Sequence, residues 1–269
     1  MIVNDGSTDR TAEIINNFKI QDSRFRVLDL ETSEHSPGAK VVRTFDKGLQ
    51  ALDWKDFDVV CKYDADIVFP TNYLEKIKQT FETNPKAGIV SGLVYIKKYK
   101  SNSEIKNLRN PNENWLDFSN KNNEWIFENL SSKNHVRGPI KSYRKELFLK
   151  MNGLRAVLGW DNIDVMLCKM HGFETVTLQE LWVKHLRPTA YKYKSQKAEK
   201  LGEYFYNIGL NFPLAAISSA KSSWKNKSVS EFFITMKSFL KQKNPRVLSQ
   251  EEIEFIRNLR WNEMFKKIT

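Results

Sequence analysis

Long apolar runs are missing from this sequence. A helix that spans a membrane needs roughly 18 or more consecutive apolar residues, and the longest candidate, at residues 212–217, is interrupted by Pro213. The first residues contain no basic stretch that leads into an apolar stretch and a cleavage site, so the sequence predicts no export signal. We therefore expect a soluble or peripheral protein in the cytoplasm.

Cysteine is scarce as well. The two cysteines, Cys61 and Cys168, lie far apart in apolar contexts. This scarcity argues against a disulfide framework and a thiolate metal site. Both side chains are expected to be reduced and to lie in the core.

Apolar residues and positive charge, in contrast, are abundant. Of 269 residues, 41% are hydrophobic and 12% aromatic, which is enough to bury a substantial core. The formal charge is +11, and residues 190–269 hold fifteen Lys and Arg against seven Glu, a net of +8. Such a basic segment suits nucleic acid, anionic lipid or mere solubility. Because the sequence has no zinc-ligand spacing or nucleic-acid recognition motif, we expect no nucleic-acid partner.

Strand patterns alternate with amphipathic helix patterns along residues 1–189. Strands are expected at residues 1–3, 25–30, 57–63, 87–96, 136–143 and 175–186, and helices after residue 9, at 41–52, 73–81 and 145–151, and up to residue 171. The alternation predicts an α/β domain with a mostly parallel sheet flanked by helices. From residue 190 the apolar spacing, as at Phe232, Met236 and Phe239, predicts a basic helical extension over residues 190–269.

The triplet Asp64-Ala65-Asp66 directly follows the strand expected at residues 57–63. A strand end supplies rigidity, and the turn after it exposes both carboxylates. Hard cations such as Mg²⁺ and Mn²⁺ prefer oxygen ligands and keep open positions for substrate phosphates. The triplet therefore suits a metal site, although an ordinary solvated turn explains it equally well by itself.

Residues 2–11, Ile-Val-Asn-Asp-Gly-Ser-Thr-Asp-Arg-Thr, resemble the nucleotide-binding turn of the inverting family 2 glycosyltransferases. The resemblance implies a Rossmann-like A-type nucleotide-sugar transferase fold. It implies that Asp5 binds the nucleotide base and that Gly6 and Ser7 belong to the nucleotide-binding turn. It also makes Asp66 the principal ligand of Mn²⁺ or Mg²⁺, with Asp64 contacting the ribose or the metal.

The segment Gly159-Trp160-Asp161-Asn162-Ile163-Asp164 resembles the acidic motif that supplies the family's catalytic base. Many members have Glu-Asp where this sequence has Trp-Asp, so the base is either Asp161 or Asp164. We favour Asp161, because its distance to the helix end at residues 171–172 suits the family spacing. Asp164 would then orient the acceptor or the appended C-terminal helix, and Trp160 would lie near the sugars.

Three further positions are assigned from the resemblance. His185, after the last predicted strand, matches a metal-ligating histidine, although a lone histidine is as often structural. Lys40 matches a basic position that approaches the nucleotide, and a solvated lysine is the alternative. Arg137 and Gly138 match the place beside the donor sugar, where Gly138 is otherwise a simple bend.

The resemblance implies a glycosyltransferase catalytic domain at residues 1–189. It would move a sugar from a nucleoside-diphosphate sugar to a glycan or lipid-linked acceptor with inversion, in cell-surface polysaccharide or lipopolysaccharide synthesis at the inner face of the membrane. Relatives begin with a further strand and helix before the Asn-Asp-Gly turn, and this sequence begins inside the second strand. An inactive nucleotide-sugar-binding remnant is therefore an alternative.

Three segments of the sequence admit two interpretations each. The run Asp64-Ala65-Asp66-Ile67-Val68 after an apolar strand also resembles the nucleophile motif of haloacid-dehalogenase-type phosphatases, whose strand should open the domain. The aromatic segment with Trp115 and Trp125 either covers the acceptor or packs into the core. The helix near residues 232–241 either lies on an anionic membrane or packs on the catalytic domain.

Overall fold

The computed structural model describes residues 1–34, 36–98, 114–187 and 197–266. The chain packs as two compact units, the first formed by residues 1–57, 153–164 and 196–269 and the second by residues 58–152 and 165–195. The predicted domain boundary at residues 189 and 190 lies outside the described residues. The division into residues 1–189 and 190–269 therefore stays a prediction.

The first unit begins with a strand-helix-strand motif. The motif consists of β1 (Ile2–Asp5), α1 (Thr11–Gln21) and β2 (Val27–Leu30). It is followed by α2 (Ala39–Gln50) and the short 3-10 helix η1 (Trp54–Asp56). β1 and β2 pair in parallel, with Asp5 opposite Leu30, as expected when a helix connects two strands. A side chain at Gly48 of α2 would collide with Val3 of β1, so the glycine lets this helix pack closely on the strand.

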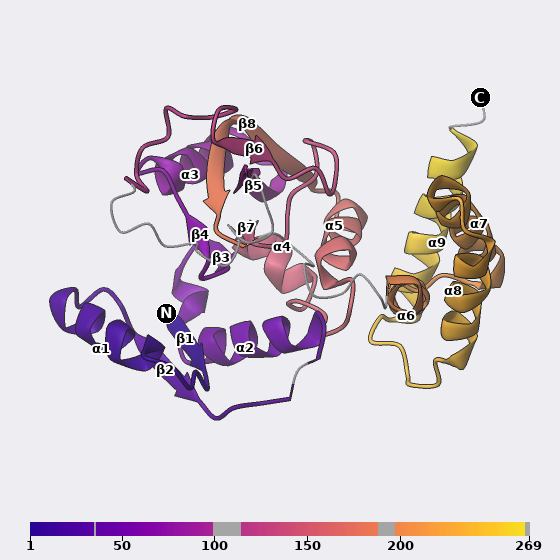
Figure 1. Ribbon diagram of the computed structural model, residues 1–269, viewed down its shortest axis with the longest axis horizontal. Helices are drawn as coiled ribbons and strands as arrows, with labels where there is room; N and C mark the ends of the chain where they lie inside the picture. Colours follow the sequence, from indigo (N-terminus) through magenta and orange to yellow (C-terminus); the bar gives the residue numbers. More distant parts are fainter. Residues whose placement is uncertain (35, 99–113, 188–196, 267–269) are drawn as a thin grey trace. The chain divides into compact units, whose positions relative to one another are not determined.

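Four helices complete the first unit. They are α6 (Lys197–Asn207), α7 (Phe212–Asn226), α8 (Val229–Lys241) and α9 (Gln250–Phe265). α7 is capped by Asn211 and α9 by a capping box of Ser249 and Glu252. α7 packs on both α8 and α9 (Figure 1). The predicted helical C-terminus is confirmed, and none of the helices in the described part of the chain is long and apolar enough to cross a membrane.

The second unit is built on one central sheet. Its strands follow the order β3 (Val59–Tyr63), β7 (Ile140–Arg144), β5 (Ala87–Lys97), β8 (Glu174–His185), β4 (Ile67–Val68), with β6 (Trp125–Phe127) also paired to β5. The helices are α3 (Tyr73–Thr83), α4 (Lys145–Lys150) and most of α5 (Trp160–Met170), whose first turn belongs to the first unit. α3 packs against β5 (Figure 1).

The α/β class with a central sheet flanked by helices is confirmed, but the strand directions differ from the expected mostly parallel sheet. β5 and β8 are parallel, whereas β3–β7, β5–β7, β5–β6 and β4–β8 are antiparallel. A parallel connection needs a crossover of a dozen or more residues, usually a helix. The chain between β5 and β7 has no helix among its described residues, and β7 returns antiparallel.

Both faces of the central sheet are covered by apolar side chains. Tyr73, Ile77 and Phe81 of α3 pack on one face with Val90 and Val94 of β5. On the other face an aromatic cluster joins the sheet side chains to the segment before β7; its members are Leu93, Tyr95, Trp115, Phe118, Trp125, Phe127, Trp182 and Leu186. Trp125 is fully buried, so for this side chain the core-packing alternative is correct.

Only one cysteine lies in the core. Cys168 is buried and Cys61 is exposed, and both are free thiols. Cys61 stands on β3 between the buried Val60 and Lys62. Because successive strand residues point to opposite faces, Cys61 faces away from both, which corrects the expectation that it is a core residue.

Candidate active site

Backbone hydrogen bonds hold the Asp64-Ala65-Asp66 turn at both ends. The Asp64 N–H donates to the Pro139 carbonyl over 2.9 Å, which continues the β3–β7 ladder past Tyr63. The Leu186 N–H donates to the Asp66 carbonyl, also over 2.9 Å. The predicted position of both carboxylates after a strand, β3, is confirmed. The turn is fixed to the residue before β7 and to the residue after β8.

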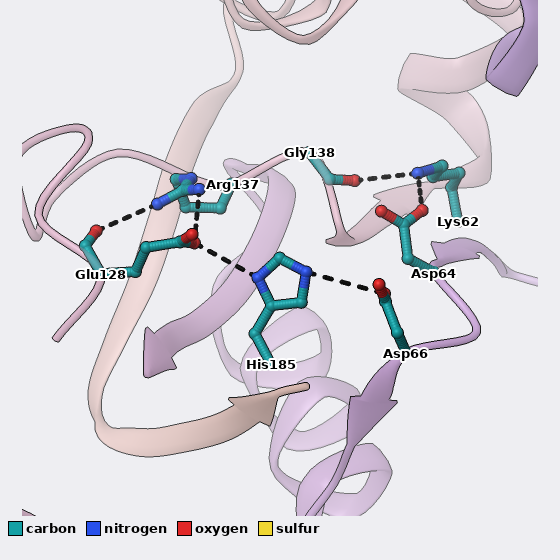
Figure 2. Close-up of polar contacts among 7 residues, drawn as sticks. All are labelled: Lys62, Asp64, Asp66, Glu128, Arg137, Gly138 and His185. Atoms are coloured by element: carbon teal, nitrogen blue, oxygen red, sulfur yellow. Dashed lines mark hydrogen bonds and ion pairs between the residues drawn. The ribbon is translucent and has the colours of Figure 1, made fainter. Parts of the chain in front are cut away.

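His185 is brought to Asp66 by the pairing of β4 with β8, in which Ile67 lies opposite His185. The imidazole Nε2 lies 3.6 Å from Asp66 Oδ1, and the ring is almost fully buried. Figure 2 shows the ring between Asp66 and Glu128. Two side chains that are far apart in the sequence therefore meet at one point.

Lys62 forms an ion pair with Asp64 inside the second unit. Its side chain is only 4% exposed, its ammonium contacts Asp64 Oδ1, and it donates to the Gly138 carbonyl over 3.4 Å (Figure 2). A buried ammonium requires an anionic or hydrogen-bonding partner. The two carboxylates of the triplet thus each face a basic side chain, Lys62 at Asp64 and His185 at Asp66.

Glu128 lies on the far side of His185 and is 3% exposed. Its Oε2 lies 3.4 Å from His185 Nδ1 and accepts a 2.8 Å hydrogen bond from Arg137 Nη2. Arg137 Nη1 also donates to the Glu128 carbonyl over 3.1 Å. Arg137, which was predicted beside the donor sugar, is therefore directed at Glu128, and its role toward a sugar stays a prediction.

These contacts change the pKa values of Asp66 and His185. Burial alone would lower the pKa of His185, but hydrogen bonds and charges from Asp66 and Glu128 outweigh burial and raise this pKa to about 9. Burial would raise the pKa of Asp66, but the hydrogen bond and charge of His185 outweigh it and lower the pKa. The imidazole is therefore protonated at neutral pH when no cation is bound, and a cation must displace its proton.

Asp66 and His185 fit a divalent cation. They offer one oxygen and one nitrogen, and their 3.6 Å separation suits two ligands that each lie about 2.1 Å from a shared ion. In the described ranges no three His, Cys, Asp or Glu side chains are arranged so that they could hold a metal ion together. With Asp66 and His185 as its two protein ligands, a cation at this place would have open positions for oxygens of substrate phosphates.

In the first unit, Lys40 of α2 contacts Asp5, the last residue of β1. Lys40 Nζ lies 3.1 Å from Asp5 Oδ2 and donates to the Ser33 carbonyl over 2.9 Å. The Ser33 hydroxyl lies 3.4 Å from Asp5 Oδ1. The structure therefore brings Lys40, which the sequence assigned to the nucleotide, to the side chain assigned to the base.

The turn that holds Asp5 depends on Gly6. Gly6 has φ of 66°, and a side chain there would collide with Thr32, whose hydroxyl donates to the Gly6 carbonyl over 3.1 Å. The Ser7 N–H donates to the Asn4 side chain. Residues 4–7 thus form a tight turn in which the Asp5 side chain is partly exposed. Its role in nucleotide binding stays a prediction.

The acidic segment at residues 159–164 forms the first turn of α5. Trp160 and Asp164 are buried, with Asp164 2% exposed, while Asp161 is partly exposed. Asp161 lies near Tyr204 of α6: burial is the main cause that raises the Tyr204 pKa to about 12, and the charge of Asp161 adds to it. Of the two candidate bases, only Asp161 has appreciable solvent access.

The structure groups the predicted residues into two sets. The first unit contains Asp5, Gly6, Ser7, Lys40, Trp160, Asp161 and Asp164. The second unit contains Asp64, Asp66, Arg137, Gly138 and His185. Lys62 and Glu128 were not predicted. Lys62 had a recognisable signal, a lysine inside the apolar strand that precedes the triplet, whereas nothing near Glu128 in the sequence distinguished it from an exposed glutamate.

Comparison with known sequences gives a family match and a more distant relative. The family model described as glycosyl transferase family 2 matches residues 1–148. Poly-beta-1,6-N-acetyl-D-glucosamine synthase of Staphylococcus epidermidis is 34% identical over 92 residues, which are 34% of this chain and 20% of that enzyme. The chain thus matches about a fifth of the length of this curated relative.

Solved structures resemble the fold. The structure of GalNAc-T7 with UDP, GalNAc and Mn²⁺ has a TM-score of 0.57 and 11% identity, over 99% of this chain and 50% of that chain. The mannosyltransferase PcManGT from Pyrobaculum calidifontis, in complex with GDP-Man and Mn²⁺, has a TM-score of 0.48 and 16% identity, over 98% and 65%. At such identity the GalNAc-T7 likeness bears on the fold alone.

Proposed function

The chain belongs to glycosyl transferase family 2, and on that premise we propose that it transfers a sugar from a nucleoside-diphosphate sugar to an acceptor hydroxyl with inversion. The observation that carries the proposal is the Asp66–His185 pair at the end of a turn anchored on two strands. A carboxylate and an imidazole facing one point suit a divalent cation, and an anionic donor diphosphate requires a counter-charge.

We propose residue roles within each unit separately. Asp5, Gly6, Ser7 and Lys40 would bind the nucleoside, and Asp66 and His185 would hold Mn²⁺ or Mg²⁺, with Asp64 beside them. The cation, when bound, neutralises negative charge on the departing nucleoside diphosphate. The GalNAc-T7 structure, which shares the fold, contains UDP and Mn²⁺, and this supports a nucleotide and a divalent cation as the ligands.

Asp161 is proposed as the general base. An acceptor hydroxyl is a weak nucleophile near neutral pH, so a carboxylate must remove its proton as it attacks. The hydroxyl proton moves to Asp161, the acceptor oxygen bonds to the anomeric carbon, and the bond from that carbon to the diphosphate oxygen breaks with its electron pair. One displacement of this kind inverts the anomeric configuration. Asp164, which is 2% exposed, would orient the acceptor or the appended C-terminal helix.

The acceptor is proposed to be a glycan or lipid-linked glycan of cell-surface polysaccharide or lipopolysaccharide synthesis, at the cytoplasmic face of the membrane. The sequence likeness to a polysaccharide synthase supports the glycan. Residues 212–241 contain five Lys and one Glu, and Trp224 and Phe233 in this segment are 88% and 65% exposed. Exposed aromatic side chains among lysines suit an anionic lipid surface.

A nucleotide-sugar screen tests the function. The purified chain would be heated with UDP, GDP and their sugars, with and without Mn²⁺, because ligands of the native state raise its melting temperature. The donor with the largest shift would then be incubated with oligosaccharide acceptors, and released nucleoside diphosphate measured. We expect a shift that requires Mn²⁺ and acceptor-dependent release.

Three results would contradict the proposal. Binding without any release would favour the inactive remnant. Release of phosphate from a simple phosphomonoester would favour a phosphatase of the haloacid-dehalogenase type. Salt-sensitive binding to nucleic acid without nucleotide-sugar affinity would favour a nucleic-acid-binding protein.

A further inference from the structure

We propose that Glu128, held by Arg137, is a positioning residue that orients the imidazole of His185 for cation binding beside Asp66. The inference rests on the proposed cation site and assigns a role to a residue outside the predicted set. It depends on three contacts drawn in Figure 2: Arg137 to Glu128, Glu128 to His185 Nδ1, and His185 Nε2 toward Asp66.

The two ring nitrogens of His185 have different neighbours. Nδ1 lies 3.4 Å from Glu128 Oε2, and Nε2 lies 3.6 Å from Asp66 Oδ1. An imidazole that binds a metal must keep one nitrogen unprotonated, and the other nitrogen usually donates to a carboxylate or carbonyl. If a cation displaces the proton of Nε2 while Nδ1 donates to Glu128, the Nε2 lone pair is directed to the side where Asp66 lies.

Glu128 itself is held in place from two directions. Arg137 donates both to its carboxylate and to its carbonyl, and the Glu128 N–H donates to the Val94 carbonyl over 3.0 Å. An arginine that donates charge-assisted hydrogen bonds holds a buried carboxylate in position. Side chain and backbone therefore allow Glu128 little freedom to follow a ring that turns away.

Strand β5 connects the two residues through the backbone. Its Ile96 lies opposite Ile126 of β6 and opposite His185 of β8. Glu128 follows β6 by one residue, and His185 is the last residue of β8. The two strands that hold these residues therefore pair with the same residue of β5. This common frame sets the distance between Glu128 and His185 independently of the Asp64-Ala65-Asp66 turn.

Direct Mn²⁺ binding to the metal-free full chain tests the role, measured by the electron paramagnetic resonance signal of free Mn²⁺. We expect Glu128→Gln to raise the Mn²⁺ dissociation constant about 10- to 100-fold, the usual effect of removing a partner of a metal ligand. Glu252→Gln is the matched control, because Glu252 also forms a largely buried pair with an arginine, Arg155, at 2.6 Å in the first unit. Its dissociation constant should equal that of the unmodified chain.

The outcomes separate this inference from the proposed function. If the unmodified chain binds Mn²⁺, Asp66→Asn abolishes binding and Glu128→Gln binds within twofold of the unmodified chain, then the positioning role is wrong and the cation site stands. If the unmodified chain binds no Mn²⁺, both are wrong.

A second variant covers the case in which Glu128→Gln does not fold. The double variant Glu128→Met with Arg137→Met replaces the buried pair by apolar groups of similar length, a change that proteins often tolerate. We expect it to fold and still to bind Mn²⁺ at least tenfold more weakly. Normal Mn²⁺ affinity in a folded double variant would overturn the role of Glu128.

Discussion

Asp66 Oδ1 and His185 Nε2 lie 3.6 Å apart because the two-residue strand β4 pairs with the end of β8. The residues are separated by most of the second unit in sequence, yet the pairing leaves a carboxylate and an imidazole facing one point. Backbone hydrogen bonds hold both residues: the Asp66 carbonyl accepts from the Leu186 N–H, and His185 lies opposite Ile67 in the β4–β8 pair.

Removing the divalent cation should abolish sugar transfer in the unmodified chain, and added Mn²⁺ should restore it. Asp66→Asn should lower transfer at least 100-fold even with excess Mn²⁺, because a cation that stabilises a leaving diphosphate contributes several kcal/mol. Nucleoside diphosphate release after chelation and after addition of Mn²⁺ measures both effects. Asp53→Asn, at an exposed carboxylate, is the control. Full activity in the presence of chelator would contradict the cation site.

Asp161→Asn should leave donor binding nearly unchanged and lower turnover by two to four orders of magnitude, on the order of the contribution of a general base. Donor affinity from thermal shift and the turnover number from product release separate the two quantities. Asp164→Asn is the comparison. This variant should mainly have a lower melting temperature, because Asp164 is buried. Unimpaired turnover of Asp161→Asn would remove this residue from the role.

The raised pKa of Asp46 should make the stability of the fold depend on pH. Burial raises the pKa of this α2 carboxyl to about 6, above its ordinary value of 3.8. The folded state therefore holds this proton more tightly than the unfolded state, and the stabilisation is complete below pH 3.8 and lost as the pH rises through about 6. Asp46→Asn should raise the melting temperature at pH 7 to 8 and give no gain at pH 4.

The size of this gain follows from the partial exposure of Asp46. Discounted for solvent screening, the effect is about 1 kcal/mol, or roughly 2–4 °C for a chain of this size. Melting curves of both proteins from pH 4 to pH 8 measure it, with exposed Asp56→Asn as the control. A gain that is the same at both ends of the range would show that charge is not its cause.

Trp224 and Phe233 should bind the chain to vesicles that contain anionic phospholipid. Replacing both by Ser should lower the partition coefficient roughly tenfold or more, because each exposed aromatic side chain loses apolar contact with lipid. Sedimentation with anionic and with neutral vesicles measures binding, and added salt should weaken it. Leu74→Ser, at a 62% exposed leucine of α3, is the control. Equal binding of all three proteins would exclude this surface.

Local patterns were sufficient to predict most elements of this fold. The strands that become β3, β5 and β8 and the helices α2, α3 and α4 were expected within a few residues of their observed bounds, because their apolar spacing is regular over a full element. The two short strands β4 and β6 were not predicted. They have two and three residues, too few for a periodic pattern, and they exist only through pairing with β8 and β5.

Site prediction from the sequence had a similar limit. Asp64 and Asp66 were recognisable because both follow one apolar strand. Glu128 could not be found, because its importance depends on the distance to a histidine 57 residues later. The contact of Arg137 with Glu128 could not be predicted for the same reason. Contacts of this kind are set by strand pairing, which a single sequence does not specify.

Adjacent residues of β8 point to opposite faces of the sheet and make different contacts. Lys184 donates to the carbonyls of Trp115 and Asp117 and lies over the Phe118 ring, while His185 contacts Glu128 and Asp66 on the opposite side. Inserting or deleting a single residue in this strand would exchange the two side chains, placing an ammonium where the imidazole belongs and leaving the aromatic segment without its tether. The length of β8 is thereby constrained by both faces at once, so natural variation should accumulate as substitutions rather than as gaps.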